Sequence, residues 1–147
     1  MSAQYSSKHG LVSRSQPELY MAFADMRNFA AMLPEERKRD VTAAYDSISA
    51  TVQGFTIGVK VTRREPYSYI ELQDDGAPFK FMVSLHFDPA EDASKTDFHI
   101  DLLADLNLMM KMMLGNKLQD ALDKIVDGLV AVSEGRRPDG VPADFKF

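Results

Sequence analysis

Two segments in the second half of the chain alternate apolar and polar residues so regularly that they constrain the whole fold. They are FKFMVSLHF (79–87) and TDFHIDLLADL (96–106), separated by the polar loop 88–95. Because successive side chains of a strand point to opposite faces, each segment places five apolar residues on one face. These residues are Phe79, Phe81, Val83, Leu85 and Phe87 in the first segment and Phe98, Ile100, Leu102, Ala104 and Leu106 in the second. Two neighbouring strands of this kind need a large apolar cover.

The segment that follows predicts this cover as a helix. From Leu114 to Ser133 apolar residues recur at helical spacing, opposite a polar face. The predicted apolar stripe consists of Leu118, Ala121, Leu122, Ile125, Leu129 and Val132. At ~1.5 Å per residue the helix is about 30 Å long, enough to cross a sheet.

The residues just before this helix do not fit its stripe. When an ideal helix is continued backwards from Leu114, Met110 falls at the edge of the stripe, and Met112 and Met113 fall on the polar face. Four of the chain's nine methionines lie between positions 109 and 113. Because methionine adapts to irregular apolar surroundings, these side chains are interpreted as core packing, as the rim of a ligand pocket, or as a contact surface.

A second helix is predicted near the N-terminus. Ser15 and Glu18 have capping-box spacing, apolar residues recur at helical intervals from Leu19 to Leu33, and Pro34 ends the run. A short alternating segment, 5–14, precedes this helix. Strand-like segments at 45–52, 55–65 and 67–72 follow it, the first two separated by a turn at Gln53-Gly54.

This order of elements predicts an α+β fold. We expect a curved antiparallel sheet of about six strands wrapped around a long C-terminal helix, with one or two N-terminal helices after the first strand. Residues 1–135 are predicted to form a single domain, and residues 136–147 a C-terminal tail.

Composition excludes several classes of protein. The net charge of −5 gives no general attraction to nucleic acid, and the absence of cysteine excludes disulfides and thiol catalysis. No apolar run approaches the ~20 residues of a membrane span, so stable membrane insertion is not expected and a cytoplasmic location is predicted. No sequence motif indicates a cofactor.

Several short motifs, taken in order, resemble the helix-grip superfamily, which includes START lipid-transfer domains, the major birch pollen allergen and polyketide cyclases (SRPBCC). The matching residues are Ser15, Glu18, Tyr20 or Phe23, DMRNF (25–29), Leu33-Pro34 and REPYSYIEL (64–72). The resemblance extends over nearly the whole chain to Gly135. It implies a cavity between the sheet and the terminal helix that holds a hydrophobic or amphipathic small molecule.

The first functional hypothesis is therefore a non-catalytic binder of such a molecule, lipid-, sterol- or polyketide-like. The residues predicted to line the site are Phe23, Met26, Phe81, Val83, Leu85, Ile100, Leu102, Ala104, Met110, Leu114 and Leu118, with His9 and Tyr5 as polar groups. A second hypothesis is a cyclase or aromatase in which His9 or Tyr5 transfers a proton. A third is a protein-interaction module or homodimer that uses Met112 and Met113.

His86 and His99 form the remaining candidate site. If Phe87 pairs with Phe98, the two imidazoles face each other, with Asp88 and Asp101 on the same face. Two imidazoles and a carboxylate are ligands that zinc accepts. This face is opposite to the apolar one, so solvated cross-strand polar residues are the preferred interpretation, and no metal site is predicted.

Overall fold

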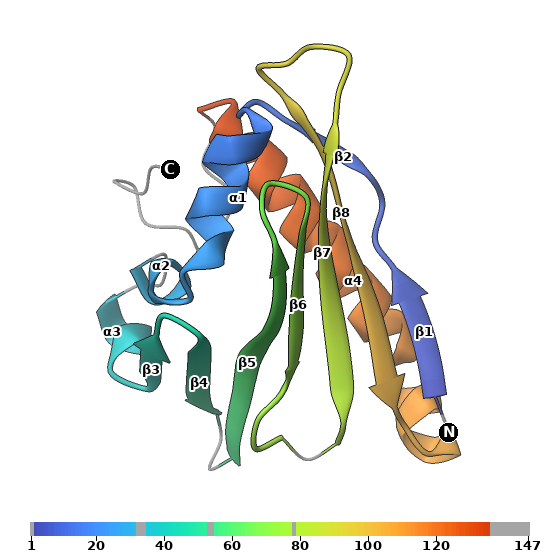
Figure 1. The fold of residues 1–147 in the computed structure, drawn as a ribbon. Helices are drawn as coiled ribbons and strands as arrows, with labels where there is room; N and C mark the ends of the chain where they lie inside the picture. The colour runs from blue at the N-terminus through green and yellow to red at the C-terminus, as the bar shows by residue number, and fades with distance from the viewer. Residues whose placement is uncertain (1, 32–34, 53–54, 78, 136–147) are drawn as a thin grey trace.

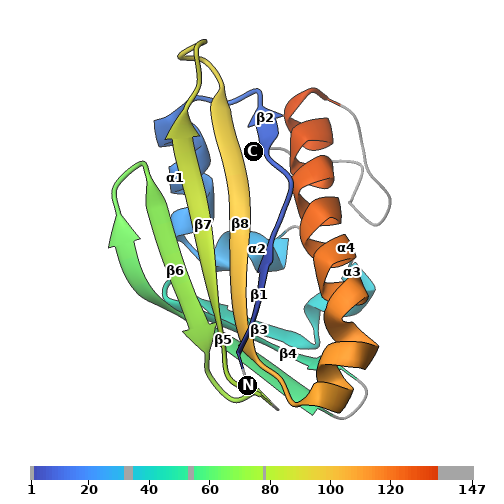
Figure 2. The same cartoon turned by 90° about the vertical axis from the view of Figure 1, so that its right-hand side faces the viewer.

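The protein is described by a computed structural model, which covers residues 2–31, 35–52, 55–77 and 79–135. One antiparallel sheet of eight strands curves around the long helix α4 (Figures 1 and 2). Its strands are β1 (Ser2–Ser6), β2 (Gly10–Val12), β3 (Val41–Ala44), β4 (Ser47–Val52), β5 (Phe55–Glu65), β6 (Tyr69–Asp74), β7 (Phe81–Pro89) and β8 (Thr96–Asp105). The strand order is β1-β8-β7-β6-β5-β4-β3, and β2 also pairs with β8. The predicted α+β class is confirmed.

The sheet has more strands than the roughly six predicted from the sequence. The N-terminal alternating segment is divided into β1 and β2, and the four-residue strand β3 was not predicted. The predicted turn at Gln53-Gly54 lies outside the described residues.

The predicted register of the last two long strands is confirmed. Phe87 lies opposite Phe98, and Phe81 lies opposite Ala104. The inward-facing residues of β8 are all buried, whereas Leu103, on the other face, is exposed. Alternation along the chain therefore assigned the inner face of the sheet correctly.

Helix α4 (Leu108–Ser133) begins six residues earlier than predicted. The side chain of Asn107 caps it by accepting a hydrogen bond of 2.8 Å from the backbone N–H of Met110. The first two turns carry exposed apolar residues, so they lack the amphipathic pattern from which the start at Leu114 was predicted. Local capping, rather than burial, sets where the helix begins.

The predicted apolar stripe of α4 is rotated from the observed one. Val126 is fully buried, whereas the side chain of Ile125 is 49% exposed. The reason is a close approach at Gly10 in β2, where an added Cβ would lie 2.5 Å from Val126 Cγ1 and 2.8 Å from Val130 Cγ2. Because glycine has no side chain, α4 rests on the strand with this face inward.

The helix predicted near the N-terminus is divided into two. It comprises α1 (Gln16–Ala24) and α2 (Arg27–Ala31), followed after the undescribed residues 32–34 by the short helix α3 (Glu35–Lys38). One half of the predicted capping box is confirmed: the Ser15 hydroxyl accepts a hydrogen bond from the backbone N–H of Glu18. The Glu18 carboxylate accepts a hydrogen bond from the Ser15 hydroxyl, whereas a capping box has it accept from the backbone N–H of this residue. The predicted end of the helix, at Leu33-Pro34, lies outside the described residues.

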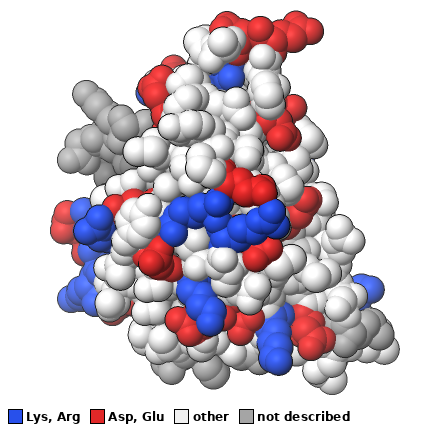
Figure 3. Space-filling view, viewed as in Figure 1, with Lys and Arg blue, Asp and Glu red and all other residues white. Residues whose placement is uncertain are grey.

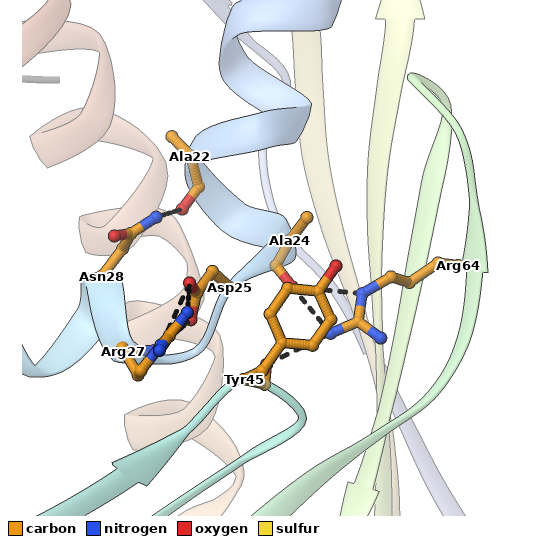
Figure 4. A network of polar contacts seen from close by, with 7 residues as sticks. All are labelled: Ala22, Ala24, Asp25, Arg27, Asn28, Tyr45 and Arg64. Atoms are coloured by element: carbon orange, nitrogen blue, oxygen red, sulfur yellow. Dashed lines mark hydrogen bonds and ion pairs between the residues drawn. The ribbon is translucent and has the colours of Figure 1, made fainter.

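A polar network at the end of α1 explains the break (Figure 4). Asp25 has an extended backbone, and its carboxylate accepts hydrogen bonds from the guanidinium of Arg27. Arg64 of β5 donates to the free carbonyl of Ala24, with its Nη2 at 2.7 Å, and its guanidinium lies 4.3 Å from the centre of the Tyr45 ring. These contacts end α1 and attach it to the sheet.

Candidate functional site

A row of apolar side chains crosses the inner face of the sheet at one level. Cross-strand pairing aligns one residue from each of β5, β6, β7, β8 and β1. This inner row consists of Val61, Leu72, Val83, Leu102 and Tyr5. Leu102 and Val83 were predicted to line a ligand site. Cross-strand pairing extends the row on the same face to Val61 at one end and to Tyr5 at the other.

The predicted lining residues fall into two groups by burial. The first group is buried in the core and consists of Phe23, Met26, Leu85, Ile100, Leu102 and Ala104. The second group is only partly buried and consists of Tyr5, Phe81, Val83, Met110, Leu114 and Leu118. The two groups therefore differ in how much solvent reaches them.

An aromatic core fills one end of the inner face. The Phe23 ring stacks on Phe98 at 5.5 Å between centroids and also contacts Phe87. The partly buried group lies toward the other end, where β8 leads into α4 (Figure 1). Two members of the buried group, Leu102 and Ala104, lie at this second end as well, opposite Val83 and Phe81.

Helix α4 covers one edge of the sheet more closely than the rest. It packs against β1, β2 and β8. Ile48, Val59 and Val61, on β4 and β5, belong to the same apolar layer but remain partly exposed. The inner face thus offers apolar surface beyond the strands that the helix contacts.

The hydroxyl of Tyr5 is the polar group of the inner row. It is buried and has no hydrogen-bond partner among the described residues. It lies beneath α4 at Gly115, where an added Cβ would be 3.1 Å from the oxygen. A buried hydroxyl without a partner costs roughly 1–3 kcal/mol, and a polar atom of a ligand would remove this cost.

The alternation of the N-terminal segment predicts that His9 and Tyr5 lie on the same face. In the structure they lie on opposite faces of the sheet. From the pair Ser6–Asp101 to the pair Gly10–Phe98, the N-terminal segment advances four residues while β8 advances three. One extra residue in one strand reverses the alternation after it. Tyr5 consequently faces inward, whereas His9 lies on the outer face.

The outer face gathers all three histidines of the chain into one column (His9, His99 and His86). The rings of His86 and His99, which lie opposite each other on β7 and β8, stack at 4.3 Å with an interplanar angle of 1°. His9 stacks on His99 at 4.2 Å. This histidine column is unrelated to the inner row, since the sheet separates them.

Carboxylates lie along the histidine column. Asp97 Oδ1 is 2.9 Å from His9 Nδ1, and Asp101 Oδ2 is 3.0 Å from His86 Nε2. Burial lowers the pKa of His99, and the neighbouring imidazoles of His86 and His9 lower this pKa further. The side chain of His99 is only 16% exposed, so the solvated face predicted from the sequence is partly closed at this position.

Charged residues elsewhere are of mixed sign. On the face shown in Figure 3 basic and acidic side chains lie close to one another. The guanidinium of Arg64 is bound in the network that ends α1.

The sequence matches no known protein-family profile, and no curated protein matches it. Solved structures do match. A START superfamily protein from Mycobacterium smegmatis superposes with a TM-score of 0.57 at 17% identity, covering 86% of this chain and 98% of its own. Norcoclaurine synthase from Thalictrum flavum gives 0.63 at 10% identity, with 86% and 87% coverage. This chain has the helix-grip fold.

A third helix-grip match is the Aha1 dimer from Colwellia psychrerythraea, with a TM-score of 0.52 at 15% identity, covering 82% of this chain and 96% of the other. The resemblance noted in the sequence is thereby confirmed for the fold. In the part of the chain that is described, no helix of this helix-grip domain is long and apolar enough to cross a membrane.

Sequence reasoning missed two features of the helix-grip interior. Val61 and Leu72 join the inner row only through pairing across β5, β6 and β7, which no local pattern reveals. The approach of the Tyr5 hydroxyl to Gly115 likewise brings together two segments that lie far apart in the chain.

Proposed function

We propose that this protein binds a hydrophobic or amphipathic small molecule between the inner face of the sheet and the N-terminal half of α4. The observation that carries the proposal is the combination of partly buried apolar side chains on β7 and the first half of α4 with the buried hydroxyl of Tyr5, which has no hydrogen-bond partner among the described residues. The apolar side chains supply affinity, and the hydroxyl sets the orientation of the guest.

Burial provides the free energy for such binding. Covering apolar surface is worth about 25 cal/mol per Å², so side chains that are already buried contribute little and partly exposed ones contribute most. Phe81, Val83, Met110, Leu114 and Leu118 meet this requirement. The residues of the aromatic core, such as Phe23, support the site without contacting the guest.

The cyclase hypothesis named two residues that could transfer a proton, His9 and Tyr5. The structure leaves one of them on the inner face. His9 lies on the outer face, so Tyr5 is the one of the pair that faces the interior. Of the two groups named for proton transfer, Tyr5 therefore remains as the candidate on the inner face.

The test compares two tryptophan substitutions on the same helix. Leu118→Trp adds bulk to the proposed site, whereas Ile125→Trp adds the same bulk to the exposed face of α4. Binding of the fluorescent probe 8-anilinonaphthalene-1-sulfonate is titrated for both variants and for the unmodified protein. We expect Leu118→Trp to weaken probe binding at least about tenfold, a change of ~1.4 kcal/mol, and Ile125→Trp to leave it unchanged.

A folded Leu118→Trp variant that binds the probe as tightly as the unmodified protein would contradict the proposal. Circular dichroism of each variant establishes that it is folded. Native mass spectrometry of freshly purified protein adds an independent measurement, because a guest carried from the cell appears as extra mass that denaturation releases.

The role of Tyr5 is tested separately. Tyr5→Phe removes the buried hydroxyl and leaves the ring. We expect this variant to be at least as stable as the unmodified protein, since an unpaired polar atom is lost, and to bind a carbonyl-bearing guest more weakly. If Tyr5→Phe is destabilised, the hydroxyl already has a partner in the free protein and is not reserved for a ligand.

Self-association is a second candidate, favoured by the exposed start of α4. Met112 and Met113 are 77% and 65% exposed, and Leu108 and Met109 extend the same apolar surface. One of the helix-grip structures that match this chain is a dimer. The double variant Met112→Glu/Met113→Glu tests this: light scattering should show the unmodified protein as a dimer and the variant as a monomer. A monomeric unmodified protein would reject the dimer.

A further inference from the structure

The outer face of the sheet carries a second arrangement of chemically active side chains, independent of the inner row. His86 Nε2 lies 3.0 Å and His99 Nε2 lies 3.8 Å from the same oxygen, Oδ2 of Asp101. Two imidazole nitrogens therefore converge on one carboxylate oxygen. We propose that His86, His99 and Asp101 bind a divalent transition-metal ion, with Zn²⁺ as the best match.

The ligand types select this class of ion. Imidazole nitrogen with a carboxylate suits zinc and its neighbours in the transition series, whereas calcium and magnesium require shells of oxygen ligands. Three protein ligands leave one position of a tetrahedral ion for water. The side chains of His86 and Asp101 are 28% and 33% exposed, so solvent reaches this position.

The distances require only a small adjustment. One donor atom from each of the three residues lies within 4.8 Å of the others. Zinc bonds of about 2.0–2.1 Å in a tetrahedral arrangement bring ligand atoms to about 3.3 Å apart. Because an ion lies along the in-plane lone pair of each ring nitrogen, the stacked, parallel rings of His86 and His99 also have to turn so that these lone pairs converge. The ring torsion of histidine has a broad range that allows this turn.

The surrounding hydrogen bonds already orient the ligands. The hydroxyl of Ser6 donates to Oδ1 of Asp101 at 2.7 Å, which leaves Oδ2 directed toward the imidazoles. The ring of Tyr69 lies edge-on against His86 at 5.2 Å and limits its rotation. Partners of this kind hold metal ligands in place and raise the affinity of the site.

The environment of His99 is the independent observation that indicates a metal. Its Nδ1 atom is buried and has no hydrogen-bond partner among the described residues, although Asp88 Oδ2 lies 3.9 Å away. When Nε2 binds a metal, Nδ1 carries the proton and donates it to a carboxylate in the usual carboxylate–histidine–metal arrangement. Asp88 is placed for this role, and a small movement would complete it.

His9 is not one of the proposed ligands. Its Nδ1 is paired with Asp97, and its ring covers the other side of His99. It thus shields the site from solvent and offers a matched control, since it is a third histidine in the same column.

The experiment titrates the tag-free, full-length protein with zinc chloride by isothermal calorimetry, with metal content checked by mass spectrometry after dialysis. We expect one zinc ion per chain for the unmodified protein and for His9→Gln. Asp88→Asn should weaken affinity about 10–100-fold, as loss of such a partner does in other sites, and His86→Gln and His99→Gln should weaken it more. Zinc should also raise the melting temperature of the unmodified protein but not that of His86→Gln.

Three results would overturn the proposal. One is the absence of saturable one-to-one zinc uptake by the unmodified protein. Another is a His86→Gln variant, folded by circular dichroism, that binds zinc as well as the unmodified protein. The last is a loss of zinc affinity in His9→Gln as large as in His86→Gln. His9 would then be a ligand, and the assigned set of ligands would be incorrect.

Discussion

The contact between Gly10 and α4 leads to a quantitative prediction about how the helix is seated. In a Gly10→Ala variant the new methyl group would lie 2.5 Å from Val126 Cγ1. Carbon atoms pack best at about 3.5–4.0 Å, so the helix or the strand has to move by about 1 Å. The backbone of Gly10 is not in the left-handed region, so the strain comes from this contact and from the one with Val130 Cγ2 at 2.8 Å.

The expected loss of stability follows from two opposing effects. Overpacking of a well-packed contact costs about 1–3 kcal/mol. Replacing glycine also restricts the unfolded chain, which stabilises by about 0.4–1 kcal/mol. We therefore expect Gly10→Ala to lower the free energy of unfolding by up to about 2.6 kcal/mol, and by ~1.3 kcal/mol at the middle of the two ranges. Each kcal/mol corresponds to about 2–4 °C in melting temperature.

A double-mutant cycle measured by urea unfolding tests the cause. Val126→Ala removes the nearer of the two opposing methyl groups and leaves that of Val130, at 2.8 Å, in place. Gly10→Ala should cost at least ~1 kcal/mol less in the Val126→Ala background than in the unmodified protein, within the range of coupling found for contacting residues. Equal costs in the two backgrounds, or stabilisation by Gly10→Ala alone, would show that this contact does not set the position of α4.

Three further predictions concern the helix phase, the α1 network and acid stability. In urea unfolding, Ile125→Ala should change the free energy of unfolding by less than about 0.5 kcal/mol, whereas Val126→Ala should lower it by about 2 kcal/mol. Similar losses in the two variants would mean that both side chains are equally buried. Arg64→Ala should lower the free energy of unfolding by about 1.5–3 kcal/mol in the same assay. Arg64→Lys should recover only part of this loss, because one ammonium group cannot bond all the acceptors that the guanidinium reaches. Full recovery would mean that charge alone matters. The hydrogen bond from Arg27 lowers the pKa of Asp25, so the stability that this pair contributes is present above the usual aspartate pKa and is lost as the pH falls through the lowered value. Asp25→Asn should accordingly flatten the decline of stability below pH ~4, and an unchanged decline would exclude the pair as a contributor.

The inner face of the sheet was predictable because its signal is local. Residues two apart in a strand share a face, so the apolar runs of β7 and β8 identified the buried side. The helix cap at Ser15 was equally local, since both partners lie within one turn. The resemblance to helix-grip proteins added the order of the elements.

The candidate sites were only partly predictable because they depend on residues far apart in the chain. The partly exposed group around Val83 and Leu118 was expected, but which of the lining residues are sealed in the aromatic core was not. The break of the first helix at Asp25 depends on Arg64, forty residues away. No pattern within the helix itself records that contact.

By itself the sequence determined which strand faces are apolar, where the first helix is capped and in what order the elements follow, because these depend on spacing within a few residues. Only the tertiary structure decided the rotation of α4 and the faces of Tyr5 and His9. The helix turns toward Gly10, a strand position without a side chain, and a single extra residue between β1 and β2 reverses the alternation. Both depend on which residues of distant segments meet, and the periodicity of one segment carries no information about its partner.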